Sequence, residues 1–376
     1  MFEKTKALCE TFMKLGVPGL DLVVYQDGKE VLRHTAGYQD LEKTIPMTGR
    51  ERYHIYSCSK LITCTAALQL WEQGKYKLED KLSDYIPEFA HMTVQTESGV
   101  KDAKNPILIK HLFTMTAGMD YAIAGNPDLQ AYIAEHPDSP TVEAVKQMAK
   151  RPLRYEPGEG WLYSLAHDVL AALVEIWSGQ KFEQYVQEHI FIPLGMKDST
   201  FMLPIEDFDQ LCVQYKRNTQ TGQITRTQSN VYRLGPAYAS GGAGCASTVE
   251  DYIKFCEALR TCKLLKPETL KMMTTAQLDE RQFACYTKTE RHSYGLGVHT
   301  PKPGGYRRDF GWGGAAGAYA VIEPECGVSI FYAQHMPGAA NMSHRWRIAD
   351  AVMADLFDRP MEAWEPVIDA NYNLTY

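Results

Sequence analysis

The sequence predicts an α/β protein of the α+β kind, in which an antiparallel sheet is flanked by helices and carries an inserted helical lobe. Two observations support this fold class. Strand-like segments lie near both ends of the 376-residue chain, and helical periodicity dominates the middle. We therefore expect one unit over 1–376, with a sheet-containing lobe from 1–56 and 292–376 and a mainly helical lobe from 57–291. An active site is expected in the cleft between the lobes.

The N-terminal segment predicts a helix followed by a β-hairpin. Residues 2–15 show an amphipathic helical pattern that ends before Gly16 and Pro18. Next, LDLVVYQ and EVLRHTAG flank Asp27 and Gly28, a pair typical of tight hairpin turns.

The remaining elements follow from the spacing of apolar residues. Helices are expected at 58–74, 107–116, 142–150, 165–178, 182–190 and 248–261. Strands are expected at 294–299, 317–323 and 327–334, with a final helix at 341–357. No internal repeat or low-complexity linker interrupts this order.

Composition narrows the class of protein. Hydrophobic residues make up 45% and charged residues 23%, and the net charge of −7 argues against a nucleic-acid partner. Acidic residues and a histidine interrupt the apolar window 161–177, so no membrane partner is expected. Nine scattered cysteines and an N-terminus without a signal-peptide pattern predict a cytoplasmic protein with reduced thiols. Nothing in the sequence indicates the oligomeric state.

The pattern S-x-x-K, which can pair a nucleophile with a base, occurs three times, beginning at Ser57, Ser98 and Ser178. Ser98 lies in a polar loop, where nothing fixes the geometry of a serine and a lysine. Ser178 comes directly before Gly179, which resembles the glycine that ends a helix. Only Ser57 precedes a long apolar helical pattern, so Ser57 and Lys60 are the candidates for chemistry.

On a helix, positions i and i+3 share a face, which places Lys60 beside the Ser57 hydroxyl. The free N–H groups at a helix start favour a developing alkoxide, and desolvation favours a neutral lysine that can accept a proton. The alternative is an ordinary helix start, with Ser57 as N-cap and Lys60 solvated. A bare S-x-x-K more often has this second meaning.

Two further segments bear on that choice. Tyr163 begins another helix, and a phenol beside a lysine can relay protons to a leaving group. Trp312, Gly313 and Gly314 lie near the start of a strand, where glycines allow close approach of a substrate and a backbone N–H can bind a carbonyl oxygen.

The three motifs in this order resemble the penicillin-recognising serine hydrolases. The branch with class C β-lactamases, D-aminopeptidases and family VIII carboxylesterases is most similar, and its esterases often read W-x-G in the third motif. Further segments resemble the family in the same order: HLFTMTAGM at 111–119, FIPLGMKDSTF at 191–201, GGAGCASTVEDYIKF at 241–255 and YGLGV at 294–298. The resemblance covers nearly the whole chain and implies a β-lactamase/transpeptidase-like fold.

The resemblance also implies roles for single residues. Ser57 would be the acylated nucleophile, Lys60 its base and Tyr163 the proton relay. The backbone N–H groups of Ser57 and Ala315 would form the oxyanion hole. How lysine and tyrosine share the base role is open within the family.

Two departures from the family pattern bear on the substrate. Leu165 stands where the β-lactamases have asparagine, and Trp312 replaces a lysine whose ammonium would pair with a substrate carboxylate. Both changes favour neutral acyl groups, so we expect a carboxylesterase-like hydrolase of small esters or amides with weak or no β-lactamase activity. Asp120 and Tyr121 either line the pocket or form a polar loop.

Other functions find less support. No G-x-S-x-G, metal-ligand or nucleotide-binding pattern occurs, so neither metal nor cofactor is expected. His167 and Asp168 follow a serine but are expected to form a pair on a helix surface. The alternatives are an acyltransferase, a D-amino-acid peptidase or amidase, and a binding protein that has lost turnover.

Overall fold

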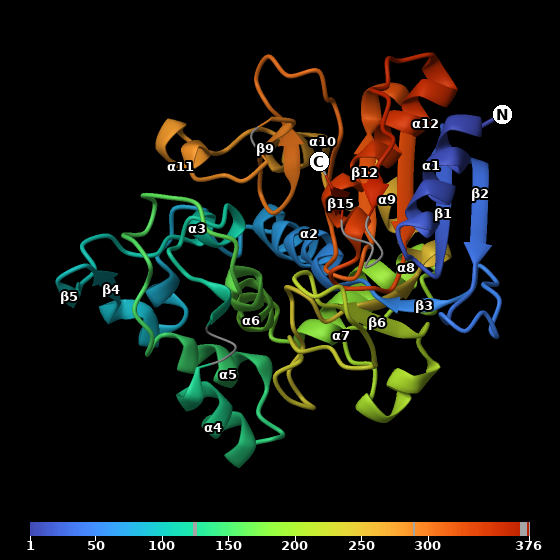
Figure 1. Ribbon diagram of the computed structural model, residues 1–376. Coiled ribbons are helices and arrows are strands. Elements are labelled where there is room, and N and C mark those ends of the chain that lie inside the picture. The colour runs from blue at the N-terminus through green and yellow to red at the C-terminus, as the bar shows by residue number, and fades with distance from the viewer. Residues whose placement is uncertain (123–125, 289, 369–373, 376) are drawn as a thin grey trace.

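The framework is a seven-stranded antiparallel sheet with the strand order β2-β1-β13-β12-β11-β10-β9 (Figure 1). The computed structural model describes residues 1–122, 126–288, 290–368 and 374–375. The strands are β1 (Gly19–Gln26), β2 (Lys29–Gly37), β9 (His292–Tyr294), β10 (His299–Pro301), β11 (Phe310–Gly313), β12 (Tyr319–Glu323) and β13 (Val328–Ala333). Because β1 pairs with β13, the two ends of the chain share one sheet, as the sequence predicted.

The first hairpin has the predicted turn. Asp27 and Gly28 join β1 to β2 with φ values of 50° and 78°. Two consecutive positive φ angles match the right-handed twist of the strands, and Asp-Gly tolerates them. The Asp27 N–H also donates to the carbonyl of Gly327, which ties the turn to the one before β13.

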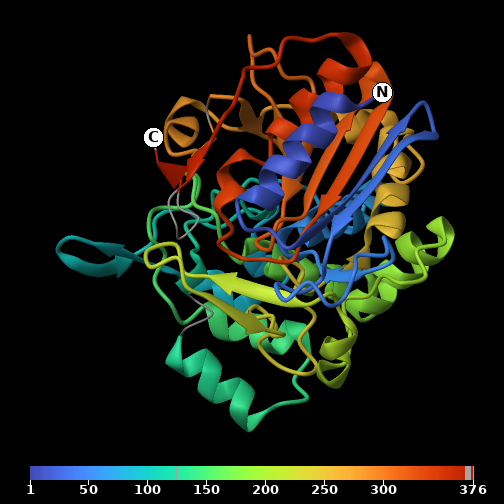
Figure 2. The ribbon, with the colours of Figure 1, turned by 45° about the vertical axis from the view of Figure 1, so that its right-hand side comes forward.

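Helices cover both faces of the sheet. Figure 2 shows α1 (Glu3–Lys14) beside α12 (Arg347–Phe357) over one face. α9 (Val249–Arg260) packs against β1, β12 and β13 from the other face. Leu22 and Val24 of β1 join the core under α1 and α12, whereas Val23 joins the larger core on the opposite side. This arrangement explains why the β1 sequence is apolar at successive positions.

The larger core belongs to the middle of the chain, where α2 (Ser59–Glu72) packs against α6 (Ala166–Ser178) (Figure 1). The other helices are α3 (Ile109–Phe113), α4 (Pro127–Glu135), α5 (Thr141–Met148), α7 (Phe182–Val186), α8 (Ile192–Leu194), α10 (Pro267–Met273) and α11 (Glu280–Ala284). Short pairs complete the fold: β3 (Arg52–His54) with β8 (Ala246–Thr248), β4 (Thr93–Thr96) with β5 (Gly99–Asp102), β6 (Gln214–Arg217) with β7 (Ile224–Thr227), and β14 (Val367–Ile368) with β15 (Leu374–Thr375). None of the described helices has the length and apolar character needed to span a bilayer.

Several expected elements differ from the structure. The helix expected at 107–116 is the shorter α3, Ile109–Phe113, and the helix expected at 182–190 is α7, Phe182–Val186, continued by a π-helical turn at Gln187–Phe191. The strand expected at 294–299 is wrong, because β9 ends at Tyr294 and β10 begins only at His299. Gly297 in the connecting turn has φ +85°, and a Cβ there would lie 2.2 Å from the Cys64 sulfur. The final helix begins later than expected, because Ala340–His344 forms a 3-10 turn before α12.

The two S-x-x-K copies set aside above lie in connections. Ser98 is at the turn between β4 and β5. Ser178 ends α6, and Gly179 closes that helix in the left-handed conformation with φ 72°.

Candidate active site

Ser57 lies in a short 3-10 turn, Tyr56–Cys58, between β3 and α2. Tyr56 has φ 47°, a left-handed conformation that costs a bulky residue on the order of 1 kcal/mol or more and is often found at functional sites. The Tyr56 hydroxyl donates to Gln214 Oε1 at 2.8 Å, which holds this conformation. The N-cap of α2 is Cys58, so the alternative of Ser57 as N-cap is wrong.

Lys60 is fully buried in the first turn of α2. Its Nζ lies 3.4 Å from Ser57 Oγ, as the i, i+3 spacing predicted. The same Nζ donates to the carbonyl of Gly242 at 2.7 Å and to the Tyr121 hydroxyl at 2.8 Å. Three oxygens therefore surround this amine.

Two tyrosines meet at Lys60 in different ways. The Nζ lies over the ring of Tyr163, 4.7 Å from its centroid, while the Tyr163 hydroxyl accepts the indole N–H of Trp312 at 2.8 Å. Tyr121 instead supplies the hydroxyl that contacts the lysine. Burial raises the pKa of Tyr121 well above its usual range, so this phenol stays protonated at neutral pH.

A cavity of about 450 Å³ opens at Ser57. Its lining consists of Ser57, Tyr121, Trp161, Leu162, Tyr163, Tyr232, Thr287, Lys288, Trp312, Gly313, Gly314, Ala315 and Arg345. Although Ser57 is only 8% exposed, its position in this lining gives a small molecule access to it. The cavity thus brings together most of the residues expected from the sequence.

Asp120 and Leu165 are placed elsewhere. A carboxylate oxygen of Asp120 lies 3.5 Å from Arg151 and 3.7 Å from Arg154, in an ion-pair cluster outside the cavity lining. Leu165 caps the start of α6 and is buried in the larger core. Of the two residues expected either to line the pocket or to form a polar loop, Tyr121 therefore lines the cavity and Asp120 does not.

Neighbouring atoms leave no room for a side chain at either of the two glycines after Trp312. A Cβ on Gly314 would lie 2.2 Å from the carbonyl oxygen of Ile55, close to the nucleophile turn. Gly314 also donates its N–H to Ala318 at 2.7 Å. A Cβ on Gly313 would lie 2.9 Å from Nη2 of Arg345. Close packing thus brings the segment of Gly314 against the turn that carries Ser57, and Ser57 and Ala315 line the same cavity.

His167 and Asp168 are both fully buried, so the expected pair on a helix surface is wrong. Asp168 Oδ1 accepts the Tyr238 hydroxyl at 2.8 Å. A Cβ on Gly242 would lie 2.5 Å from Asp168 Oδ2 and 3.2 Å from Lys60 Nζ, so this carboxyl is a neighbour of the lysine. Burial raises the pKa of Asp168, and the charge of Lys60 opposes that rise. Sequence reasoning missed this proximity, and no motif indicated it.

The ammonium of Lys288 lies 3.7 Å from the ring centroid of Trp312. Burial, then the charges of Arg345 and Arg291, lower the pKa of Lys288 to about 7. Trp312 replaces the lysine of the third motif, but the cavity still contains an ammonium. A lysine from the segment between α11 and β9 supplies one, and no motif in the sequence indicated it.

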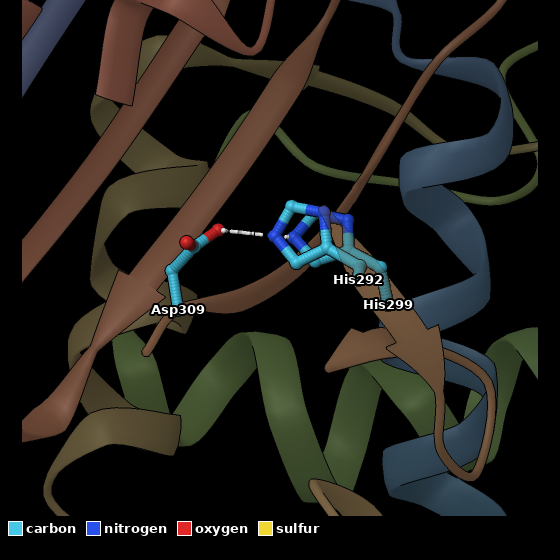
Figure 3. Close-up of side chains that lie close together, drawn as sticks. All are labelled: His292, His299 and Asp309. Atoms are coloured by element: carbon cyan, nitrogen blue, oxygen red, sulfur yellow. Dashed lines mark hydrogen bonds and ion pairs between the residues drawn. The ribbon is translucent and has the colours of Figure 1, made fainter. Parts of the chain in front are cut away.

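A second cluster, His292, His299 and Asp309, is buried (Figure 3). The ring centroid of His299 lies 6.1 Å from that of Trp312. These residue types can hold a metal. The Nε2 atoms of the histidines lie 3.2 and 3.3 Å from Asp309 Oδ2, and Arg307 lies 3.4 Å from Oδ1. Hydrogen bonds and this ion pair satisfy the carboxylate, and the guanidinium disfavours a second cation.

The sheet order, with a serine and lysine one turn apart at the start of a buried helix, defines a β-lactamase/transpeptidase-like fold. Residues 5–353 match the family described as Beta-lactamase, and the chain belongs to that family.

The relatives of this chain include hydrolases and acyltransferases. The esterase EstB of Burkholderia gladioli is 28% identical over 343 residues, covering 83% of this chain and 84% of EstB. The acyltransferase mokF of Monascus pilosus is 31% identical over 284 residues, covering 72% and 68% of the two chains. The structure of EstCE1, a hydrolase with promiscuous acyltransferase activity, aligns with a TM-score of 0.76 at 24% identity, over 93% of this chain and 97% of that one. At that identity the last comparison supports the fold alone.

Proposed function

We propose that this protein is a serine hydrolase that acts through an acyl-enzyme on Ser57, with carboxylic esters as its main substrates. One observation carries the proposal: the Ser57 hydroxyl lies 3.4 Å from the buried amine of Lys60 and lines the cavity. Similarity to an esterase and to acyltransferases supports the same chemistry, because both transfer acyl groups.

The surroundings of Lys60 suit a general base. A neutral amine has two N–H donors and one lone pair. Gly242 and Tyr121 accept the two donors, so the lone pair is directed toward Ser57. Lys60 then takes the Ser57 proton while Oγ bonds to the ester carbonyl carbon.

The rest of the reaction follows from the neighbours of Ser57. The backbone N–H groups of Ser57 and Ala315 stabilise the oxyanion of the tetrahedral intermediate. The intermediate collapses as the bond to the alcohol oxygen breaks, and that oxygen receives the proton through Tyr163. Trp312 donates to the Tyr163 oxygen, which stabilises a transient phenolate. Water then attacks the acyl-enzyme by the reverse relay, releases the acid and restores Ser57.

We expect esters to be favoured over β-lactams because the second and third motifs depart from the β-lactamase pattern, although Lys288 supplies an ammonium to the cavity from outside the motifs. Leu165 offers no amide to a substrate or to Lys60. The Trp312 indole is an apolar wall at the position where the β-lactamases have a lysine. We therefore expect β-lactam turnover to be weak or absent.

The experiment compares hydrolysis of nitrophenyl butyrate with that of nitrocefin by wild type, Ser57→Ala and Ser98→Ala. The last variant is a matched control, because Ser98 begins an S-x-x-K copy in a hairpin turn. We expect a preference for the ester, a loss of roughly 10³-fold or more in Ser57→Ala, and wild-type rates in Ser98→Ala. A preference for nitrocefin, or an active Ser57→Ala protein, would contradict the proposal.

Acyl transfer is the second candidate, favoured by the 31% identity to an acyltransferase. In that reaction an alcohol or amine takes the place of water as acceptor. Product analysis with butyl alcohol added to the ester assay separates the two. Butyl butyrate in excess of butyrate would identify a transferase, and butyrate alone a hydrolase.

A further inference from the structure

We propose that Lys288 and Arg345 form an anion-binding subsite in the Ser57 cavity, so that the preferred substrates carry a carboxylate in addition to the reacting ester. This inference rests on the proposed ester hydrolysis and specifies its substrate class. The subsite lies outside the three motifs, because Lys288 precedes β9 and Arg345 precedes α12.

Lys288 is held in position by the wall of the cavity. Its Nζ lies 3.7 Å from the ring centroid of Trp312, within the range of a cation–π contact. The same indole donates to the Tyr163 hydroxyl. A substrate group bound by Lys288 would therefore lie on a surface continuous with the residues around Ser57.

Arg345 is fixed by backbone carbonyls and leaves one nitrogen at the cavity. Nη1 donates to Gly314 at 2.6 Å and Ala318 at 2.9 Å, and Nε donates to Met342 at 3.1 Å. Nη2 lies next to Gly313, where a Cβ would be only 2.9 Å away. The absence of a side chain on Gly313 thus leaves room for this nitrogen beside the lining.

These two cations face the cavity without a counter-ion. Its lining contains no aspartate or glutamate, and across the described ranges of the chain neither Lys288 nor Arg345 forms an ion pair. Placing two positive charges together in a partly desolvated site is costly. The lowering of the Lys288 pKa to about 7 is a consequence of that cost. A bound carboxylate would offset the cost of holding these two positive charges together, because its oxygens would accept charge-assisted hydrogen bonds.

The dimensions favour a small organic acid over a polymer. The cavity of about 450 Å³ is at the lower end of the range for small-molecule sites. Aromatic side chains make up much of the lining, so the part of the substrate between ester and carboxylate is expected to be apolar.

The test uses two matched pairs of esters. The nitrophenyl half-ester of glutarate is compared with nitrophenyl pentanoate, and 3-carboxyphenyl butyrate with 3-methylphenyl butyrate. The first pair places the carboxylate on the acyl side and the second on the alcohol side. For each protein the readout is the ratio of kcat/KM for the acid to that for its neutral partner.

Lys288→Met is compared with wild type and with Lys197→Met, which removes an exposed lysine outside the cavity. At pH 6, we expect Lys288→Met to lower the ratio about tenfold in at least one pair, because loss of the ammonium weakens binding of the acid and not of the neutral ester. Lys197→Met should keep the wild-type ratio. Equal ratios in wild type and Lys288→Met for both pairs would overturn the subsite while ester hydrolysis itself stands.

Calorimetric titration with glutarate gives a readout that does not depend on turnover. We expect wild type to bind glutarate at least about tenfold more tightly than Lys288→Met does. Equal affinities would overturn the subsite even if no ester were hydrolysed. If no ester is hydrolysed but glutarate binds tightly and only when Lys288 is present, the hydrolase proposal is refuted and the anion site is retained.

Discussion

At the residue scale, Lys60 is the group through which protons are expected to pass. Its amine contacts the Tyr121 hydroxyl, the Gly242 carbonyl and the Ser57 hydroxyl. The two tyrosines beside it are not equivalent. The Nζ of Lys60 lies over the ring of Tyr163, and the Tyr163 oxygen accepts the indole N–H of Trp312. The Tyr121 hydroxyl, in contrast, accepts a hydrogen bond from Lys60 itself. Their removal should therefore have different effects.

We expect Tyr163→Phe to lower kcat for nitrophenyl butyrate about 10²-fold or more, because the relay oxygen is lost. Tyr121→Phe should cost about tenfold, since Lys60 keeps Gly242 and Ser57 as neighbours. Steady-state kinetics of both variants measure this, with Tyr306→Phe as control, because Tyr306 is 64% exposed and lies outside the cavity lining. A larger loss in Tyr121→Phe would assign the relay to that residue instead.

The Lys288 ammonium makes the carboxylate preference depend on pH. The pKa of Lys288 is lowered to about 7, so the ammonium is present below that pH and is lost as pH rises through it. The groups facing it are Arg345, Arg291, Cys58, His292 and His299. In wild type the acid-to-neutral ratio of kcat/KM should fall between pH 6 and 8.5, and in Lys288→Met it should stay level. A level ratio in wild type would contradict this assignment.

Motifs predicted Ser57, Lys60, Tyr163 and Trp312 because their spacing along the chain reflects local geometry. Contacts between distant segments produce no motif that can be recognised in the sequence. Asp168 comes near Lys60, and Lys288 comes to lie over the Trp312 ring, only after the chain has folded. Composition and periodicity carry no information about such pairs.

At the element scale, loops with glycines bring the third motif against the nucleophile turn. Gly314→Ala would place a Cβ 2.2 Å from the Ile55 carbonyl oxygen, so the two segments would have to separate. We expect a fall in Tm of several degrees, which corresponds to about 1–3 kcal/mol for overpacking, and a larger relative loss of ester hydrolysis. Thermal unfolding and kcat measured on the same sample check this. An unchanged Tm would show that the contact is not close.

The long helices and the first hairpin could be predicted because their periodicity and the Asp-Gly turn are local signals. The region 294–299 could not, because its apolar residues suggest a strand while its glycines make a turn. A Cβ on Gly295 would lie 2.2 Å from the Met273 carbonyl, a contact with α10 that only the fold reveals. Short strand pairs such as β6 with β7 contain mostly polar residues, so they show no alternation of apolar and polar residues from which a strand could be predicted.

At the scale of the whole molecule, the sheet joins both ends of the chain, and the middle supplies the helix that carries Ser57. Many buried histidines accompany this packing. Burial lowers the pKa to about 3 for His54, His167 and His299, and to about 4 for His111 and His335. These side chains are neutral in the folded protein at neutral pH.

Unfolded histidines titrate near pH 6.5, so below that pH the unfolded chain binds more protons than the folded one. Stability should therefore fall as pH drops from about 6.5 toward 4, by about 1 kcal/mol per buried histidine at pH 5.5. Thermal unfolding between pH 7 and 5 measures this. His54→Phe should flatten the curve, because neither nitrogen of that ring has a partner. A Tm that does not change over this range would contradict the prediction.

The central claim is that Ser57 is the residue that becomes acylated. Intact-mass spectrometry of wild type and Ser57→Ala after exposure to a fluorophosphonate tests it most directly, with peptide mapping of the adduct. We expect one adduct on wild type, located on Ser57, and none on the variant. An adduct on another residue, or an unlabelled wild-type protein, would contradict it.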